Sequence, residues 1–204
     1  MTSPIRILLA EDQGMVRGAL AALLDLEPDL QVVAQVAAGD QVLVAAERSE
    51  PDIALLDIEM PGLDGLSAAR SLRTARPDCR VLILTTFGKP GYLRRAMDAG
   101  VAGFLVKDGP VEQLAAAIRR VLAGERVIDP ALAVAALTAG SNPLSQRERD
   151  VLAAAVDGST ATEIAGRLHL SEGTVRNYLS AAIQKTGARN RVEASRVAAD
   201  NGWL

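Results

Sequence analysis

Short apolar runs alternate with segments in which apolar residues recur every three or four positions through the first 124 residues. The run Ile53 to Leu56 is apolar throughout, as expected of a strand buried on both faces, and Pro61-Gly62 turns the chain soon after it. The apolar runs predict strands at residues 5–10, 31–37, 53–56, 81–85 and 103–106. The segments with helical spacing predict helices at 14–26, 41–49, 66–75, 92–99 and 111–123, and Asp40 is expected to cap the second.

This order of elements predicts the fold class. Five successive strand-helix units with right-handed crossovers favour an α/β domain, a five-stranded doubly wound parallel sheet with helices on both faces. Residues 125–142 are expected to form a linker, with a loop at 125–130, a short Ala-rich helix at 131–137 and a flexible boundary near Gly140. Residues 143–204 contain no strand pattern and predict a second, all-helical domain.

Polar side chains stand at the carboxyl ends of four of the predicted strands: Glu11, Asp12, Asp57, Thr85 and Lys107. Because the carboxyl ends of parallel strands meet at one edge of a sheet, these side chains should lie together, where such folds bind ligands. Three acids in a small volume repel one another unless a cation lies between them, and carboxylate oxygens without His or Cys suit Mg²⁺. Asp57 as nucleophile, Lys107 as ammonium and Thr85 as hydroxyl donor are sufficient for phosphoryl transfer to a carboxylate.

Two other interpretations of this edge remain open. Each polar residue taken singly is most simply a helix cap or a solvated turn. A phosphohydrolase also uses a strand-end aspartate with Mg²⁺, and Glu59 stands two residues after Asp57, where such enzymes carry a general acid. Glu59 however precedes Met60-Pro61, and no substrate pocket is evident in the sequence.

Capping residues divide the C-terminal part into four predicted helices. Ser145 with Glu148, Thr160 with Glu163, and Asn190 with Glu193 have the spacing of a capping box, and Ser171 with Thr174 is a weaker version. The helices are expected at 146–155, 161–168, 172–185 and 191–200. Only His169-Leu170-Ser171 separates the second from the third, which is helix-turn-helix spacing.

The third of these helices has two different faces. Its inward face is expected to carry Val175, Leu179, Ala182 and Ile183. Its opposite face carries Gly173, Arg176, Asn177, Ser180 and Gln184. A small, polar face of this kind fits the DNA major groove, where Arg suits guanine and Asn suits adenine. The alternative is an ordinary four-helix module that binds protein.

Composition narrows the possibilities further. The 204 residues carry a net charge of −3, with 13 basic and 16 acidic residues in 1–124 but 8 basic and 7 acidic in 141–204, so DNA binding would need basic groups gathered on one face. The single cysteine, Cys79, excludes an intrachain disulfide and favours a buried thiol. No apolar run approaches the roughly 18 residues of a membrane span, and the N-terminus has no secretory signal, so a cytoplasmic protein without membrane contact is expected. The one histidine, His169, is expected to be a solvated or capping group rather than a phosphoryl donor.

Residues 4–124 resemble the receiver domain of two-component response regulators. The resemblance rests on Glu11-Asp12, on Asp57 in Leu-Asp-Ile-Glu-Met-Pro-Gly-Leu-Asp-Gly, on Thr85 in Leu-Thr-Thr-Phe and on Lys107 in Phe-Leu-Val-Lys. It implies a flavodoxin-like fold, Asp57 as phospho-acceptor, and Mg²⁺ held by Asp12, Asp57 and the Glu59 backbone carbonyl with help from Glu11. Thr85 and Lys107 would contact the phosphoryl group. Phe104 stands at the aromatic switch position and has no hydroxyl, so any switching there must depend on packing.

Residues 143–204 resemble the LuxR/NarL-type DNA-binding domain. The resemblance rests on 142–152, Glu163-Ile164-Ala165, 170–178 and Arg191-Val192-Glu193-Ala194. It implies that helix 172–185 is the recognition helix, that the last helix forms a dimer contact, and that the following residues face DNA: Thr174, Arg176, Asn177, Ser180, and Lys185 near phosphate. Thr162, Tyr178 and Ala181 depart from the usual residues and imply weaker non-specific DNA affinity.

Together the two resemblances identify a response regulator of the NarL/FixJ family, phosphorylated by a histidine kinase and binding an operator as a homodimer. Residues 85–92, 173–178 and the terminal Gly202-Trp203-Leu204 further resemble the desaturase-regulating branch. A DNA-binding protein whose receiver acts only as a phosphorylation-independent dimer scaffold is the remaining alternative.

Overall fold

The computed structural model of the chain describes residues 3–86, 90–107, 109–138 and 142–204. They form two compact units: residues 3–86 and 95–133 belong to the first, and residues 90–94, 134–138 and 142–204 belong to the second. The expected flexible boundary at residue 140 and part of the 85–92 motif lie outside the described residues. The limits 4–124, 125–142 and 143–204 stay a prediction.

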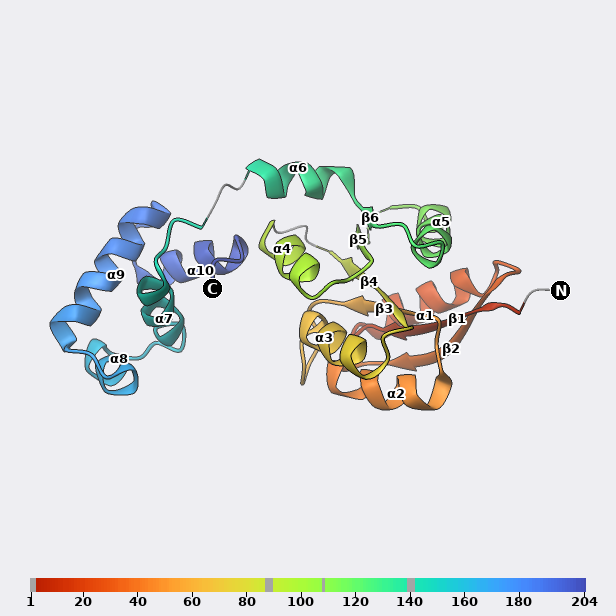
Figure 1. Ribbon diagram of the computed structural model, residues 1–204, viewed down its shortest axis with the longest axis horizontal. Coiled ribbons are helices and arrows are strands. Elements are labelled where there is room, and N and C mark those ends of the chain that lie inside the picture. The colour runs from red at the N-terminus through yellow and green to blue at the C-terminus, as the bar shows by residue number, and fades with distance from the viewer. Residues whose placement is uncertain (1–2, 87–89, 108, 139–141) are drawn as a thin grey trace. The chain divides into compact units, whose positions relative to one another are not determined.

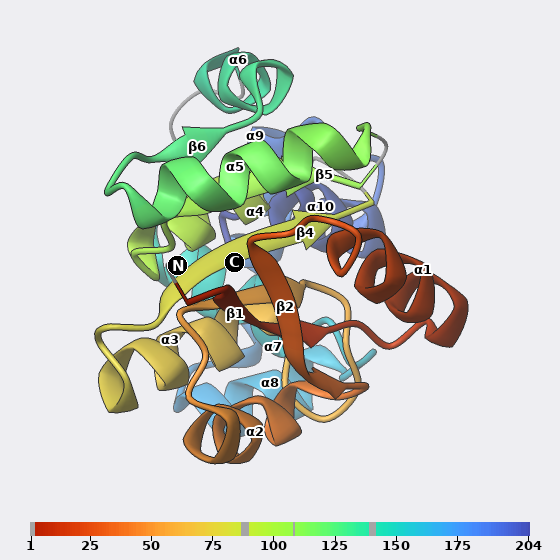
Figure 2. The ribbon, with the colours of Figure 1, turned by 90° about the vertical axis from the view of Figure 1, so that its right-hand side faces the viewer.

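The first unit is built on a parallel sheet with strand order β2-β1-β3-β4-β5-β6 (Figure 1). Its strands are β1 (Ile5–Ala10), β2 (Leu30–Val36), β3 (Ile53–Asp57), β4 (Arg80–Thr85), β5 (Gly103–Val106) and β6 (Val127–Ile128). Its helices are α1 (Gly14–Leu24), α2 (Val42–Ser49), α3 (Gly65–Ala75) and α5 (Val111–Leu122), together with the part of α4 (Pro90–Asp98) from residue 95 onward. Helices α1 and α5 cover one face and α2 and α3 the other (Figure 2). The doubly wound α/β fold is therefore confirmed.

Two predictions about this unit are wrong. The sheet has six strands rather than five, because residues 127–128, expected in a loop, pair with β5 through Gly103↔Val127 and Phe104↔Ile128. Asp40 does not cap α2, since a short 3₁₀ turn, Gly39–Gln41, intervenes and the N-cap residue is Gln41, whose side chain makes no capping bond to the helix. Asp40 instead lies against Gly62, a left-handed residue in the turn after β3.

The core explains why the strands form where they do. Every residue of β3 is buried. Ile53 and Leu55 of β3 and Leu82 and Leu84 of β4 share a core with Ile118 of α5. Cys79 is buried as expected, and burial raises its thiol pKa to about 11. Gly65 is required at the start of α3, because a Cβ there would lie 1.8 Å from the Asp57 carbonyl oxygen.

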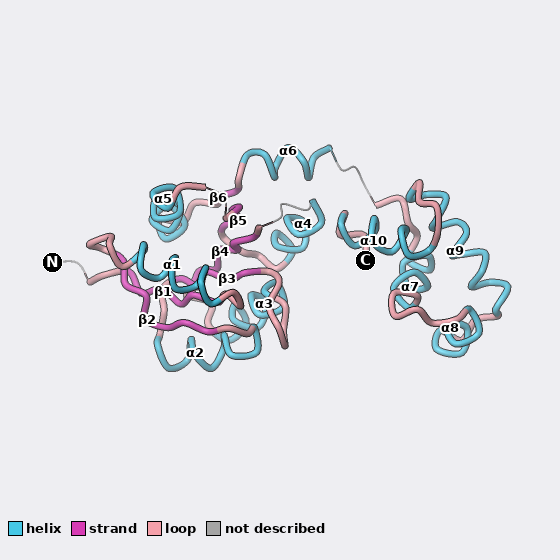
Figure 3. The backbone as a smooth tube through the Cα atoms, turned by 180° about the vertical axis from the view of Figure 1, so that it is seen from behind, coloured by secondary structure: helices cyan, strands magenta, loops and turns pink. Residues whose placement is uncertain are grey.

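The second unit contains only helices among its described residues (Figure 3). After α6 (Pro130–Thr138) come α7 (Gln146–Ala154), α8 (Ala161–Leu168), α9 (Glu172–Thr186) and α10 (Arg191–Asp200). These bounds match the predicted helices within one residue at each end. A core that includes Leu144, Val151, Ile164, Val175 and Ala198 joins α7 to α10. Within the described residues, no helix combines the length and apolar character needed to cross a membrane.

Candidate functional site: a buried acidic pocket and an exposed helix face

The sheet brings the predicted polar residues to one edge. Asp57 and Thr85 are the last residues of β3 and β4, while Glu11 and Lys107 directly follow β1 and β5. These four strands are neighbours in the sheet, and the edge includes the point between β1 and β3 where the strand order reverses, the position at which such folds bind ligands.

Lys107 joins two of the acids in a buried pocket. Its Nζ donates a hydrogen bond to Glu11 Oε2 and lies 3.0 Å from Asp57 Oδ1. The three side chains are 8%, 1% and 6% exposed, respectively. Since an isolated buried charge is strongly unfavourable, the ammonium stabilises two carboxylates that would otherwise repel each other. Lys107 thus places one positive charge between two of the three acids.

The two buried acids differ from solvated carboxyls. Burial raises the pKa of both Glu11 and Asp57 above their ordinary values, and the hydrogen bond from Lys107 partly opposes this. Backbone N–H groups also donate to them, from Gln13 to Glu11 at 3.1 Å and from Ile58 to Asp57 at 2.8 Å. These bonds hold both carboxylates in place.

The acids also fit a divalent cation. Glu11, exposed Asp12 and Asp57 each place one oxygen within 4.8 Å of the others. An all-oxygen donor set that leaves further coordination positions to water suits Mg²⁺. Glu59 lies in the turn that follows β3, with an exposed side chain. The role of its carbonyl stays a prediction.

Thr85 and Phe104 lie on β4 and β5, two of the strands whose ends form this pocket. Thr85 is 3% exposed, and its carbonyl accepts a 2.8 Å hydrogen bond from the Lys107 backbone N–H. Phe104 is fully buried, and its carbonyl accepts a 3.0 Å bond from the Asp129 N–H. Asp129 in turn accepts from the Ala131 N–H at the start of α6. A continuous hydrogen-bonded path therefore runs from β5 to α6, which sequence analysis missed because it placed residues 125–130 in a loop.

The helix-turn-helix of the second unit is formed as predicted. Ser145 and Thr160 make complete capping boxes, and Ser171 accepts from the Thr174 N–H at 3.1 Å. Asn190 accepts from the Glu193 N–H, but the Glu193 side chain bonds to the Arg189 N–H rather than returning to Asn190. His169 is an exposed left-handed C-cap of α8, with φ of 53°, which agrees with a capping role.

Helix α9 separates its faces as expected. Val175, Leu179 and Ala182 are buried, whereas Arg176, Asn177 and Ser180 are exposed. Thr174 is half-buried, with its hydroxyl 2.8 Å from the Ser171 hydroxyl. The exposed face is free of bulky apolar side chains, and its polar side chains can form hydrogen bonds with base edges.

Lys185, at the end of α9, has a partner that the sequence did not reveal. Its Nζ lies 2.8 Å from Glu148 Oε2, the same oxygen that accepts from the Ser145 N–H. The Lys185 side chain remains 42% exposed, while the Glu148 side chain is 8% exposed. The two residues are 37 positions apart, so no local pattern indicates the pair.

Comparison with known proteins finds matches over both units. Residues 7–119 match the family described as response regulator receiver domain, and residues 142–198 match bacterial regulatory proteins of the luxR family. The transcriptional regulatory protein DesR of Bacillus subtilis (strain 168) is 45% identical over 200 residues, covering 98% of this chain and 99% of DesR. An uncharacterised transcriptional regulatory protein of the same organism, YvfU, is 46% identical over 200 residues, covering 98% and 100%.

A solved structure agrees with these matches. The response regulator ChrA of a heme-sensing two-component system aligns over 100% of both chains, with 32% identity and a TM-score of 0.61. The relatives are named as regulators of transcription and not as enzymes.

Proposed function

As a member of the two-component response regulators that join a receiver domain to a LuxR-type helix-turn-helix domain, the chain is a DNA-binding transcriptional regulator, and we propose that phosphorylation of Asp57 controls its affinity for DNA. It is not an enzyme, so the phosphohydrolase interpretation is wrong. The observation that carries the proposal is the buried pocket in which the Lys107 ammonium contacts both Glu11 and Asp57 beside Asp12.

The proposed transfer begins with Asp57 ionised. Burial favours the neutral acid, and contact with Lys107 favours the carboxylate that is needed as nucleophile. A carboxylate oxygen of Asp57 forms a bond to phosphorus as the phosphorus-nitrogen bond of a kinase phosphohistidine breaks, and the histidine leaves. A small acyl phosphate is an alternative donor.

The surrounding residues would stabilise the new group. Lys107 and the Thr85 hydroxyl would donate to its oxygens, which carry an added charge of about −1.5 to −2. Glu11, Asp12, Asp57 and the Glu59 carbonyl would hold Mg²⁺, whose charge would neutralise phosphoryl oxygens. These assignments follow from the oxygen donor set and the burial described above.

The hydrogen bonds from β5 to α6 support a route by which this pocket would influence the DNA-binding domain. Movement of Thr85 and Lys107 would alter β4 and β5, and Phe104 on β5 is bonded through Asp129 to the start of α6. Because Phe104 is fully buried and lacks a hydroxyl, its response must be a change of packing. We expect this to shift the receiver toward a homodimer.

Dimerisation would raise DNA affinity without a new base contact. Two tethered domains bind an inverted repeat together, since the second binds at a high effective concentration. Within each, α9 would lie in the major groove, with Thr174, Arg176, Asn177 and Ser180 toward DNA and Lys185 near phosphate. Helix α10, which exposes Val192, would form the contact between the two domains.

The proposal is tested by comparing DNA affinity with and without phosphorylation. A duplex is first selected from a random-sequence library by the chain treated with an acyl phosphate and Mg²⁺. Treatment should raise the wild-type affinity at least about tenfold, equivalent to about 1.4 kcal/mol. Asp57→Asn should show no gain, whereas Asp78→Asn, an exposed acid before β4, should behave as wild type. An equal gain in Asp57→Asn would contradict the proposal and favour a receiver that serves only as a scaffold.

A further inference from the structure

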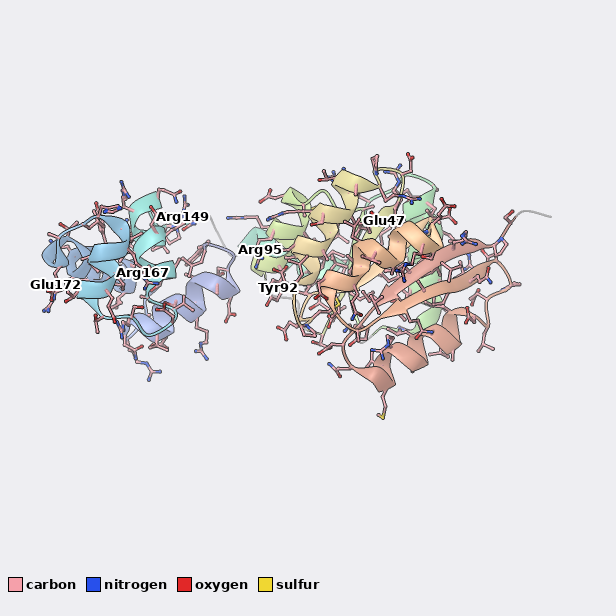
Figure 4. The ribbon with its side chains drawn as sticks, turned by 90° about the horizontal axis from the view of Figure 1, so that it is seen from below. Glu47, Tyr92, Arg95, Arg149, Arg167 and Glu172 are labelled. Carbon is pink, nitrogen blue, oxygen red and sulfur yellow. The ribbon has the colours of Figure 1, made fainter. Side chains whose placement is uncertain are left out.

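A carboxylate lies on the exposed side of the recognition helix. Glu172 is the first residue of α9, at the outer surface of the C-terminal unit (Figure 4). Its Oε1 accepts a hydrogen bond from Arg176 Nη2 one turn later, and its Oε2 accepts from Thr162 Oγ1 of α8 at 3.3 Å. The carboxylate is therefore held by two helices of the helix-turn-helix.

Glu172 carries a negative charge, which DNA phosphates repel. The hydrogen bond and the charge of Arg176 lower its pKa, so the side chain is ionised at neutral pH. Residues 141–204 hold only 8 basic and 7 acidic residues, so a single anion on the recognition helix removes an appreciable share of its attraction for DNA. Stabilisation of the helix alone does not account for the bond from Thr162 on a different helix.

The arrangement fixes Arg176 while leaving it accessible. The Arg176 side chain is 70% exposed, against 43% for Glu172. A guanidinium has five N–H donors, and Glu172 engages one Nη2 group, which leaves the other donors for guanine O6 and N7. Fixing a flexible arginine before binding reduces the entropy that it loses on binding.

We propose that Glu172 is a specificity-determining residue of the recognition helix, which orients Arg176 toward guanine and, through its own charge, weakens binding wherever that guanine is absent. This inference rests on the proposed role of α9 in the major groove. At the correct base pair, the well-placed Arg176 compensates for the repulsion between Glu172 and the phosphates. At other sequences the repulsion remains uncompensated, so specificity is gained as total affinity falls.

Two substitutions separate the two parts of this proposal. Glu172→Gln removes the charge and keeps the shape, and Glu172→Asp keeps the charge but shortens the reach to Arg176. The full-length chain, treated with acyl phosphate and Mg²⁺, is titrated by fluorescence anisotropy onto its selected duplex, onto every single-base variant and onto unrelated DNA, at several salt concentrations. Glu172→Gln should bind unrelated DNA about threefold more tightly and lose about tenfold in discrimination at one base pair, with other positions unchanged. Glu172→Asp should lose discrimination at that base pair without the gain on unrelated DNA.

Two further variants serve as references. Asp150→Asn removes an acid from α7 without touching α9, and it should change discrimination at no position. Arg176→Gln should abolish preference at the same base pair that Glu172→Gln affects. Thermal unfolding is measured for every variant, because a purely structural role of Glu172 would lower the stability of the protein and weaken its binding to all DNA sequences equally.

The outcomes distinguish this inference from the proposed function. If Arg176→Gln abolishes a base preference and Glu172→Gln leaves it intact, or weakens all DNA uniformly, the inference is wrong and the role of α9 stands. If Arg176→Gln alters no base preference, the assignment of Arg176 as a base contact is wrong and this inference is overturned with it.

Discussion

The receiver pocket and the recognition helix use charged side chains in opposite ways. In the pocket, Lys107, Glu11 and Asp57 are each less than one tenth exposed and converge from separate strand ends. On α9, the side chains of Arg176 and Glu172 are 70% and 43% exposed and lie one turn apart on the same helix. Burial would make the first group sensitive to the proposed phosphoryl charge, because low dielectric strengthens every interaction there. Exposure leaves the second group available to a partner as large as DNA.

Each unit also contains a lysine paired with a buried glutamate, which allows a matched test. Lys107→Met leaves Glu11 and Asp57 buried without a cation, so the receiver should lose about 3 kcal/mol of unfolding free energy in the absence of divalent metal. Lys185→Met should lose only about 1 kcal/mol, because Lys185 is 42% exposed and Glu148 keeps its bond from the Ser145 N–H.

Separate probes report the two losses. Hydrogen exchange in β1, β3 and β4 reports the receiver, and the fluorescence of Trp203, the only tryptophan, reports the C-terminal unit during urea unfolding. Arg147→Met, a surface change on α7, should alter stability by less than about 0.5 kcal/mol. Equal losses in the two lysine variants would mean that burial does not distinguish the pairs.

The stability of the two regions should also respond differently to acid. Hydrogen bonds and nearby cations lower the carboxyl pKa of five acids in the C-terminal unit: Glu148, Asp157, Glu163, Glu172 and Glu193. A lowered folded-state pKa contributes stability above the ordinary value, 4.5 for glutamate, and that stability is lost as pH falls below it. Burial raises the pKa of Glu11 and Asp57 in the folded state. Their ionisation therefore reduces the stability of the receiver as pH rises from the ordinary carboxyl pKa to the raised folded-state pKa.

Urea midpoints between pH 6 and pH 4, without divalent metal, measure this difference. The Trp203 midpoint should fall on acidification, while the receiver midpoint should fall less or rise. In Asp57→Asn the opposing contribution of the pocket should be smaller, and the two midpoints should move more nearly together. Parallel curves in the wild type would contradict the contrast between the two regions.

The smallest effects should come from helix caps, where the two units follow the same local rules. Ser145 caps α7 with its hydroxyl, and Asp64 caps α3 by accepting from the Leu66 and Ser67 N–H groups. Ser145→Ala and Asp64→Ala should each reduce the stability of their unit by about 1 kcal/mol, as measured by the same two probes. A much larger loss in either would show that the cap also supports distant contacts.

This division between local and distant interactions explains what the sequence could predict. The bounds of α7 to α10 follow from caps whose two partners are three residues apart, and the strand-end position of Asp57 follows from the buried run before it. Strand β6 has two residues, too few for a periodic pattern, and forms because the edge of β5 is available beside it. The pairing of Lys185 with Glu148 likewise depends on how two helices pack.

The sequence predicted which residues form the pocket but not which of them contact one another. Sequence analysis placed three acids and Lys107 together, and the structure shows that Lys107 contacts Glu11 and Asp57. The choice of partners depends on the stagger of β1, β3 and β5 in the sheet, which no single segment encodes. The pairing of Glu172 with Arg176 could be predicted from their helical spacing in the sequence. The hydrogen bond from Thr162 could not, because it depends on how α8 and α9 pack.

The most direct test of the central claim is to locate the phosphoryl group on the chain. The full-length protein is incubated with an acyl phosphate, with Mg²⁺ or with a chelator, and analysed by intact mass and peptide mapping. We predict one phosphoryl group, on the peptide that contains Asp57, formed only with Mg²⁺, absent from Asp57→Asn and retained in Asp78→Asn. A phosphoryl group on any other residue, or unchanged labelling in Asp57→Asn, would contradict the account.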